Sequence, residues 1–250
     1  MKTILSRKLV LVFLLIAVIT SCKESTPTTG ISSGWENYGG SKEGIRYSAL
    51  TLVDTNNVKN LEVAWTFHCG DADPDHFSQI QCNPLIINGV LYGTTPRQKL
   101  FALDAFKGTQ IWTFDPFKPT DIISENIRGM AYWTDGIAQR LFFSSCMFMH
   151  SVDAKTGKLD TLFGQKGKVD LHNGLGRDVK DLDVIFTSPG MVYKDLIIIG
   201  STVDEGPAAA PGHIRALNVR TGKQEWIFHT IPQPGEFGYE TWDDPEAWKN

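Results

Sequence analysis

The chain has 250 residues, of which 42% are hydrophobic and 21% charged, and its formal net charge is −4. This composition suits a globular domain with a sizeable core. It offers no excess of basic residues to neutralise phosphates, which argues against a nucleic-acid partner. The 23 glycines and 7 tryptophans suit an all-β chain of short strands joined by tight turns.

The N-terminal residues predict an export signal. Basic residues precede an unbroken apolar run at 9–19, which is too short to span a bilayer comfortably. The run ends in Ile19-Thr20-Ser21-Cys22, which resembles a bacterial lipobox. We therefore expect residues 1–22 to be a lipoprotein signal peptide, with Cys22 carrying the lipid. A plain cleaved signal with an incidental cysteine is the alternative.

The next segment, 23–34, is rich in Ser, Thr, Pro and Gly and predicts a flexible tether. The folded part is then expected at 35–250. Together these features predict an exported protein on the periplasmic or cell-surface side, anchored to a membrane through its lipid.

Three cysteines remain beyond the lipobox, namely Cys69, Cys82 and Cys146. An odd number leaves at least one thiol unpaired within the chain. Buried thiols that act as small hydrophobes are the simpler interpretation. A Cys69–Cys82 bridge is the alternative.

Two short apolar runs on either side of turn residues predict β-hairpins. Leu85 to Ile87 and Val90 to Tyr92 flank Asn88-Gly89, a strong hairpin signal. A similar pattern flanks Lys194-Asp195.

A repeat of three units sets the predicted architecture. In each unit a glycine follows the first residue by six positions, and a tryptophan follows it by ten in the first and third units. Asp or Asn caps a turn, Gly supplies a positive φ, and the flat Trp ring can dock on a neighbouring unit. The units are Ala102, Asp104, Gly108, Trp112; Ser151, Asp153, Gly157, with Thr161 at the Trp position; and Ala216, Asn218, Gly222, Trp226.

This repeat predicts the blades of a β-propeller, since a four-stranded unit buries both faces only by stacking on its neighbours. Longer spacing between the second and third units predicts loops at 165–183 and 205–212. The alternative is a β-sandwich whose Asp-x-x-x-Gly turns coincide.

The repeat, together with several further stretches, resembles the pyrroloquinoline-quinone (PQQ) dehydrogenases of glucose and alcohols, and the glucose branch most closely. The resemblance runs from Trp35 to Asn250. The further stretches are Trp35-x-x-Tyr38-Gly39-Gly40, Arg46-Tyr47-Ser48, Asn57-Val58-x-x-Leu61, Ala64-Trp65, Asn83-Pro84-Leu85, Arg128-Gly129, Thr187-Ser188-Pro189, Pro211-Gly212-x-Ile214-Arg215-Ala216 and Phe228-His229-Thr230-Ile231-Pro232.

The resemblance implies an eight-bladed propeller of which this chain covers roughly the first three to four blades. PQQ would bind near the central axis beside Ca²⁺, and an Asp general base would assist oxidation of a sugar or alcohol. Electrons would pass to a quinone or a cytochrome. The cofactor carries the redox chemistry, and the protein binds and orients it.

Several residues match cofactor-binding positions of the family. Arg128 is expected to bind carboxylate or quinone oxygens with its forked guanidinium. Gln81 stands where relatives place a Glu, and Thr187 matches a Thr that donates to the cofactor. Their alternatives are a surface arginine, a polar strand end and a strand threonine chosen for β-propensity.

Asp204 and Glu205 match the position of a Ca²⁺ ligand, and carboxylate oxygens suit that ion. A solvated acidic loop is the alternative. The family's catalytic Asp motif comes later than residue 250, so no catalytic residue is named and the chain is interpreted as an incomplete enzyme. The competing hypothesis is a non-catalytic propeller lipoprotein that binds proteins as a scaffold in envelope assembly.

Overall fold

The structure is a computed structural model that describes residues 34–76, 78–117, 126–206 and 208–249. The described residues belong to one unit, Ser33–Asn250. The predicted signal peptide with Cys22, and the tether up to residue 33, lie outside the described residues. In the described part, no helix is both long enough and apolar enough to cross a membrane.

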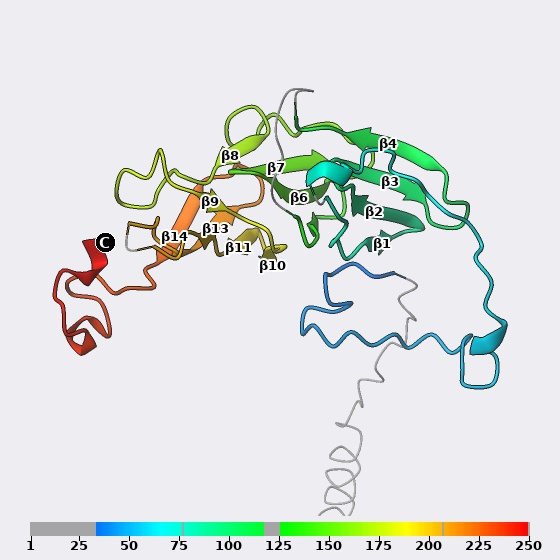
Figure 1. The fold of residues 1–250 in the computed structure, drawn as a ribbon, viewed down its shortest axis with the longest axis horizontal. Coiled ribbons are helices and arrows are strands. Elements are labelled where there is room, and N and C mark those ends of the chain that lie inside the picture. Colours follow the sequence, from blue (N-terminus) through cyan, green and yellow to red (C-terminus); the bar gives the residue numbers. More distant parts are fainter. Residues whose placement is uncertain (1–33, 77, 118–125, 207, 250) are drawn as a thin grey trace, which may run out of the picture. The chain divides into compact units, whose positions relative to one another are not determined.

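Three four-stranded antiparallel sheets follow one another along the chain (Figure 1). The first sheet contains β1 (Leu85–Ile87), β2 (Val90–Thr94), β3 (Leu100–Asp104) and β4 (Gln110–Phe114). The second contains β5 (Ala131–Thr134), β6 (Gln139–Ser145), β7 (Phe148–Asp153) and β8 (Lys168–Asp170). The third contains β10 (Met191–Tyr193), β11 (Leu196–Ile199), β13 (Ile214–Asn218) and β14 (Gln224–Phe228).

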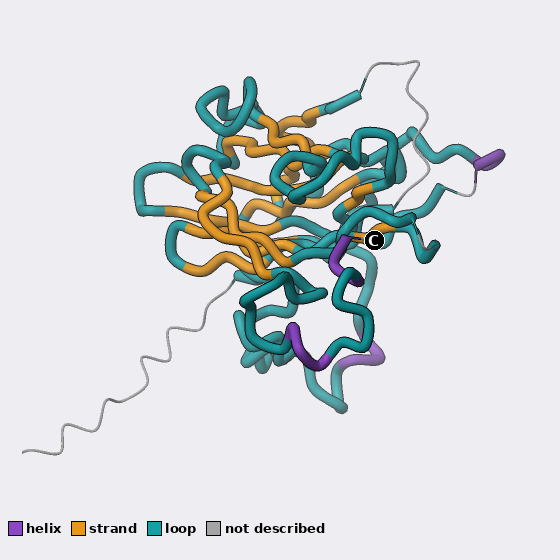
Figure 2. Tube along the Cα trace, turned by 90° about the vertical axis from the view of Figure 1, so that its left-hand side faces the viewer, coloured by secondary structure: helices purple, strands orange, loops and turns teal. Residues whose placement is uncertain are grey.

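Two short strands, β9 (Val184–Ile185) and β12 (Thr202–Val203), pair separately. Helical structure among the described residues is confined to short 3-10 turns (Figure 2). These turns are η1 (Val58–Asn60), η2 (Pro74–His76), η3 (Tyr239–Thr241) and η4 (Ala247–Lys249). The all-β prediction and the blade-like sheets are confirmed.

Both predicted hairpins are present. Ile87 pairs with Val90 across Asn88-Gly89, whose φ angles are 51° and 78°. Two successive positive φ angles match the twist of the flanking strands, and Asn-Gly adopts them most easily. Tyr193 pairs with Leu196 across the second turn.

The polar residue of each repeat unit closes the predicted turn. The Asp104 carboxylate accepts the backbone N–H groups of Phe106 and Lys107, at 2.9 and 2.8 Å. The N–H of Gly108 then donates to the Asp104 carbonyl at 2.8 Å. The same glycine-to-turn bond recurs at Gly157 and Gly222.

The repeat glycine also gives the tryptophan of the preceding unit its docking surface. A Cβ added at Gly157 would lie 2.6 Å from the Trp112 ring, and one at Gly108 would lie 2.4 Å from Trp65. The Trp112 indole N–H donates to the carbonyl of Ala154 at 3.1 Å. The sequence spacing therefore encodes contacts between consecutive sheets.

The second unit departs from this rule. Thr161 is exposed in a turn, and the outer strand is β8, inside the segment predicted as the loop 165–183. Val169 of β8 pairs with Met149, and its Cγ2 would lie 2.6 Å from a Cβ at Gly222. The loop prediction is thus wrong at 168–170, because a later piece of chain completes the sheet.

A different tryptophan links the second and third sheets. Trp133 of β5 donates its indole N–H to the Lys194 carbonyl at 3.1 Å. The guanidinium groups of Arg140 and Arg220 lie 5.6 and 4.5 Å from its ring centroid. Arg220 also pairs with Asp135 at 2.8 Å. Cation–π contacts and an ion pair replace the docking seen between the first two sheets.

The core divides into two clusters. Leu85, Leu100, Met130, Leu141 and Phe143 are fully buried in one, which joins the first and second sheets. The other joins the second and third sheets. Its most buried members include Phe142, Met149, Phe163, Leu171 and Ile197. The three cysteines outside the signal are half-buried, and Cys69 and Cys82 form no disulfide bridge in the described part of the chain.

A buried polar pair lies inside the second sheet. The Ser145 hydroxyl and His150 Nε2 are 2.7 Å apart, and His150 packs on the rings of Phe114 and Phe143. Burial lowers the pKa of His150 to about 4, with a smaller contribution from Lys168. The imidazole is therefore neutral in the folded protein near neutral pH.

Replacing Gly157 by Ala should test the docking contact. Gly136 has a positive φ of 91° but open space around it, so Gly136→Ala should cost about 1 kcal/mol from backbone strain alone. Gly157→Ala adds a clash with Trp112 and should cost roughly 2–4 kcal/mol. Thermal unfolding of the full-length protein measures both, and equal losses would contradict the docking role.

Stability should fall below pH 6.5 because the unfolded chain binds a proton at His150 that the folded chain does not. The folded pKa of about 4 lies below the ordinary 6.5, so this contribution is complete above 6.5 and is lost as the pH falls to 4. It amounts to roughly 3 kcal/mol. His150→Phe should flatten the dependence of unfolding midpoint on pH. Burial also lowers the pKa of His213 to about 4, so His213 accounts for the pH dependence that remains in this variant.

Candidate cofactor site

The segments that lead into the first strands of the three sheets lie side by side. β1, β5 and β10 each occupy an edge of their own sheet. The N–H of Asn83 donates to the Arg128 carbonyl at 2.9 Å, and the N–H of Arg128 donates to the Thr187 carbonyl at 2.8 Å. The backbone therefore joins three sequence segments more than 40 residues apart. Two of the predicted cofactor residues, Arg128 and Thr187, are direct neighbours.

Close packing at this junction depends on a glycine. Gly129 is buried with φ 154°, and an added Cβ would lie 3.2 Å from Tyr38, 3.3 Å from the Asn83 carbonyl and 3.6 Å from Pro189. A side chain here would push apart the segments that position Arg128. The glycine of the Arg-Gly pair thus has a structural reason.

The Arg128 side chain is exposed, whereas its backbone is held on both sides. Within the described part of the chain, its guanidinium makes no hydrogen bond or ion pair. A guanidinium without such contacts, on a backbone that is held in place, is suited to donate two parallel hydrogen bonds to a carboxylate or to paired oxygens.

The other two predicted cofactor residues, Thr187 and Gln81, are held by fewer contacts. Thr187 is half-buried, and the preceding carbonyl of Phe186 accepts a hydrogen bond from the Ser144 hydroxyl. Gln81 is exposed, two residues before Asn83. Gln81 therefore lies on a segment bonded to Arg128, but no contact fixes its amide among the described residues.

The acidic pair is not brought to this junction by strand pairing. β12 pairs with β9 so that Val203 lies opposite Val184, which leaves Asp204 at the end of the ladder away from Thr187. Asp204 and Glu205 are both exposed, and the Asp204 carboxylate accepts the N–H of Glu205 at 2.7 Å.

No group of three or more His, Cys, Asp or Glu side chains could hold a metal ion in the part that the structure describes. Ca²⁺ takes six to eight oxygen ligands. Two adjacent exposed carboxylates therefore do not by themselves fit a calcium site.

A small cavity borders the junction. It has a volume of about 140 Å³, and its lining includes Tyr38, Met130 and Pro189. Pockets for cofactors are usually larger, about 300 to 1,000 Å³. The cavity at the junction is thus smaller than a usual cofactor pocket.

Comparison with known proteins identifies the family. Residues 35–250 match the family model of the glucose/ethanol/alcohol dehydrogenase β-propeller domain of the PQQ type. The chain belongs to this family. The match covers the same residues that the sequence assigned to the propeller.

Relatives in this family include both glucose and alcohol dehydrogenases. Quinoprotein glucose dehydrogenase A of Acinetobacter calcoaceticus is 33% identical over 86% of this chain and 31% of its own length. The dehydrogenase subunit of the quinone alcohol dehydrogenase of Gluconobacter oxydans is 30% identical over 99% of this chain and 34% of its own. The chain thus spans about a third of these relatives. Their similar identities do not separate a glucose branch from an alcohol branch.

Solved structures share the fold. A quinohemoprotein alcohol dehydrogenase from Pseudomonas putida HK5 superimposes with a TM-score of 0.66 at 25% identity, over 86% of this chain and 31% of that one. The quinohemoprotein alcohol dehydrogenase of Comamonas testosteroni gives 0.62 at 22% identity, over 81% and 28%. The propeller prediction is confirmed at the level of fold.

Sequence reasoning missed the scaffold of the junction. Asn83 and Tyr38 were matched only as parts of motifs, although Asn83 bonds to Arg128 and Tyr38 packs on Gly129. The glycine at 129 is the sequence signal for these contacts. Because Gly has no Cβ, a Gly directly after a candidate site Arg predicts that another segment packs closely there.

Proposed function

We propose that the full-length protein is a PQQ-dependent dehydrogenase that oxidises a sugar or an alcohol, and that this chain supplies part of its cofactor site. The observation that carries the proposal is the exposed Arg128 guanidinium on a backbone held between Asn83 and Thr187. Membership of the family supports the same assignment.

The chemistry of the cofactor fits the residues at the junction. PQQ carries carboxylates and an ortho-quinone, and when bound it supplies the redox chemistry of the reaction. Arg128 would bind its carboxylate or quinone oxygens in forked geometry, and the Thr187 hydroxyl and Gln81 amide would add hydrogen bonds. The hydrogen-bonded backbone fixes the point from which the side chain extends, so ligand binding would have to order the side chain but not the loop.

For the metal, the proposal covers only two ligands. Asp204 and Glu205 remain the proposed Ca²⁺ ligands of this segment, but they do not complete a site, so no step of the reaction is assigned to the metal here. The general base is likewise not assigned to any residue of this chain.

The proposed location follows from the lipobox. Export and diacylation of Cys22 would place the enzyme on a membrane surface, where a quinone or a cytochrome could accept its electrons. More than one acyl chain is needed for stable anchoring, which a lipoprotein N-terminus provides.

Replacing Arg128 tests the cofactor site. Arg128→Met in the full-length protein should weaken PQQ binding about ten- to a hundredfold, because charge-assisted hydrogen bonds are lost. Arg128→Lys should retain only part of the PQQ affinity, since Lys lacks the forked guanidinium. Titration of the apoenzyme with PQQ, followed by dye-linked activity on sugars and alcohols, measures this.

Arg220→Met is the matched control, because Arg220 pairs with Asp135 and Asp195 away from the junction. It should lower stability without changing PQQ affinity. Unaltered PQQ binding in Arg128→Met would remove Arg128 from the site. A wild-type protein that binds no PQQ would favour the protein-binding scaffold instead.

Calcium dependence tests the acidic pair separately. Asp204→Asn and Glu205→Gln each remove a negative charge while keeping the shape of the side chain. The variant that removes a true ligand should need at least about tenfold more Ca²⁺ for half-maximal reconstitution. If both variants match the wild type across a calcium titration, the pair is only a solvated loop.

A further inference from the structure

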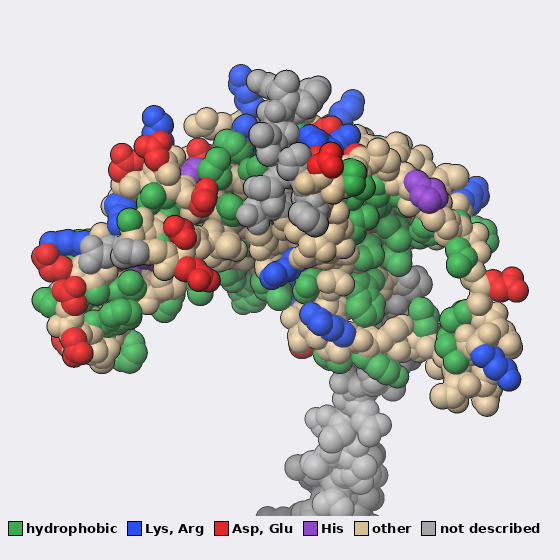
Figure 3. Space-filling model, viewed as in Figure 1, with side chains coloured by type: hydrophobic (Ala, Val, Ile, Leu, Met, Phe, Trp, Pro, Cys, Tyr) green, Lys and Arg blue, Asp and Glu red, His purple; other side chains and the backbone are tan. Residues whose placement is uncertain are grey.

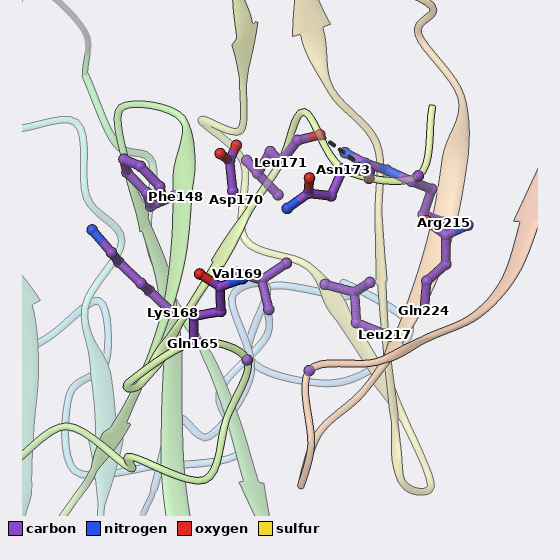
Figure 4. Close-up of a pocket in the computed structure, with 13 residues that line it drawn as sticks. Phe148, Gln165, Lys168, Val169, Asp170, Leu171, Asn173, Arg215, Leu217 and Gln224 are labelled. Atoms are coloured by element: carbon purple, nitrogen blue, oxygen red, sulfur yellow. Dashed lines mark hydrogen bonds between the residues drawn. The ribbon is translucent and has the colours of Figure 1, made fainter. Parts of the chain in front are cut away.

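A larger cavity lies between the second and third sheets, apart from the Arg128 junction (Figure 4). Its volume is about 470 Å³, within the usual range for small-molecule pockets. Phe148, Val169 and Leu217 form its apolar part. Polar groups surround it as well. They are the side chains of Gln165, Lys168, Asp170, Asn173, Arg215 and Gln224.

The cavity lies at the interface where the tryptophan docking is missing. Trp65 and Trp112 dock on Gly108 and Gly157, but Gly222 meets the smaller Val169. Val169 and Gly222 both line the cavity. A valine fills less space than an indole, so the departure from the repeat leaves room at this interface.

Arg215 is buried beside this cavity, and no acidic side chain among the described residues pairs with it. Its side chain is only 1% exposed, and it forms no ion pair within the described ranges. One terminal nitrogen donates to the carbonyls of Leu171 and Asn173 at 2.8 and 2.9 Å, and the other to the Ser201 hydroxyl at 3.4 Å. Its Nε is buried and makes no hydrogen bond.

A buried, unpaired guanidinium is costly unless something neutralises it. Burial lowers the pKa of Arg215 to about 10, so the group still carries its charge at neutral pH. Carbonyl groups satisfy some of its protons but do not balance that charge. An anion in the adjoining cavity would do so.

The remaining charges of the cavity favour a single negative charge on the ligand. Lys168 adds a second cation, with Nζ 3.9 Å from the centre of the Phe148 ring. Asp170 is the one carboxylate among the described lining residues, and its Oδ1 lies 2.7 Å from Nδ1 of His172. The amides of Gln165, Asn173 and Gln224 offer both donors and acceptors, which suit hydroxyl groups.

We propose that this cavity binds a small monocarboxylate that carries hydroxyl groups, with the carboxylate paired to Arg215. The hydroxyl groups bond to the three amides, and the carbon chain lies against Leu217 and Val169. The Gln224 amide lies close to Gly174, since its oxygen would be 2.7 Å from a Cβ added there, and both residues line the cavity. This site is separate from the proposed cofactor site.

Calorimetric titration of the full-length apoprotein with D-gluconate tests the proposal. Neutral D-glucose and unhydroxylated acetate are the comparison probes, and both should bind at least about tenfold more weakly. Arg215→Met should weaken gluconate binding by about tenfold or more.

Arg177→Met is the matched control. Arg177 also donates to backbone carbonyls, those of Ala209 and Lys249, and its Nε is also buried and unpaired. It does not line the cavity. It should reduce stability while leaving gluconate affinity within about twofold of the wild type. If Arg215→Met does not fold, Lys168→Met and Gln224→Leu replace it and should each weaken binding.

Three outcomes would overturn the proposal. They are a wild-type protein that binds no gluconate, glucose that binds as tightly as gluconate and loses that binding in Arg215→Met, and gluconate bound as tightly by Arg215→Met as by the wild type. Gluconate binding lost in Arg128→Met but kept in Arg215→Met would place the ligand at the cofactor junction. That result would reject this site and leave the proposed function intact.

Discussion

The contact on which the structure depends is an indole ring lying flat against a glycine of the next sheet. Trp112 on Gly157 is the clearest example, because the ring occupies the space that any Cβ would need. A four-stranded sheet cannot bury both faces alone, so each sheet is stable only when its neighbour is in place. The glycine leaves room for the ring, and its positive φ also closes the turn after the preceding strand.

Stacking by this contact brings together residues that are distant in sequence. Once consecutive sheets are aligned, the segments before their edge strands run side by side and exchange backbone hydrogen bonds through Arg128. The position of the Arg128 backbone therefore depends on packing elsewhere, and the close approach of its neighbours depends on the buried Gly129. Over the face drawn in Figure 3, acidic and basic side chains of the described residues are scattered, without one broad basic area.

Local features were predictable from the sequence, whereas closure of the second sheet was not. Hairpin turns and the Asp–Gly turns follow from φ preferences of a few adjacent residues, so a short motif is enough. The strand β8 could not be found this way, because it is three residues long and lies within a longer insertion. Arg128 and Thr187 were each matched to the cofactor only through resemblance, and the hydrogen bond between their backbones was not predicted. The burial of Arg215 depends on carbonyls more than 40 residues away, which no local pattern encodes.

The interface between the second and third sheets exchanges one form of stabilisation for another. Without a docked indole on Gly222, it uses Trp133 with two arginines, an ion pair to Asp135, and the hydrogen bonds of Arg215. Hydrogen bonds and ion pairs fix charged side chains through their geometry and do not require every space around them to be filled. An interface built from such contacts can therefore enclose an open volume. In a repeat protein, altering one interface changes only the contribution of that interface, and the other interfaces still contribute their own terms. Such an interface is where a propeller can acquire a second ligand site without disturbing the first.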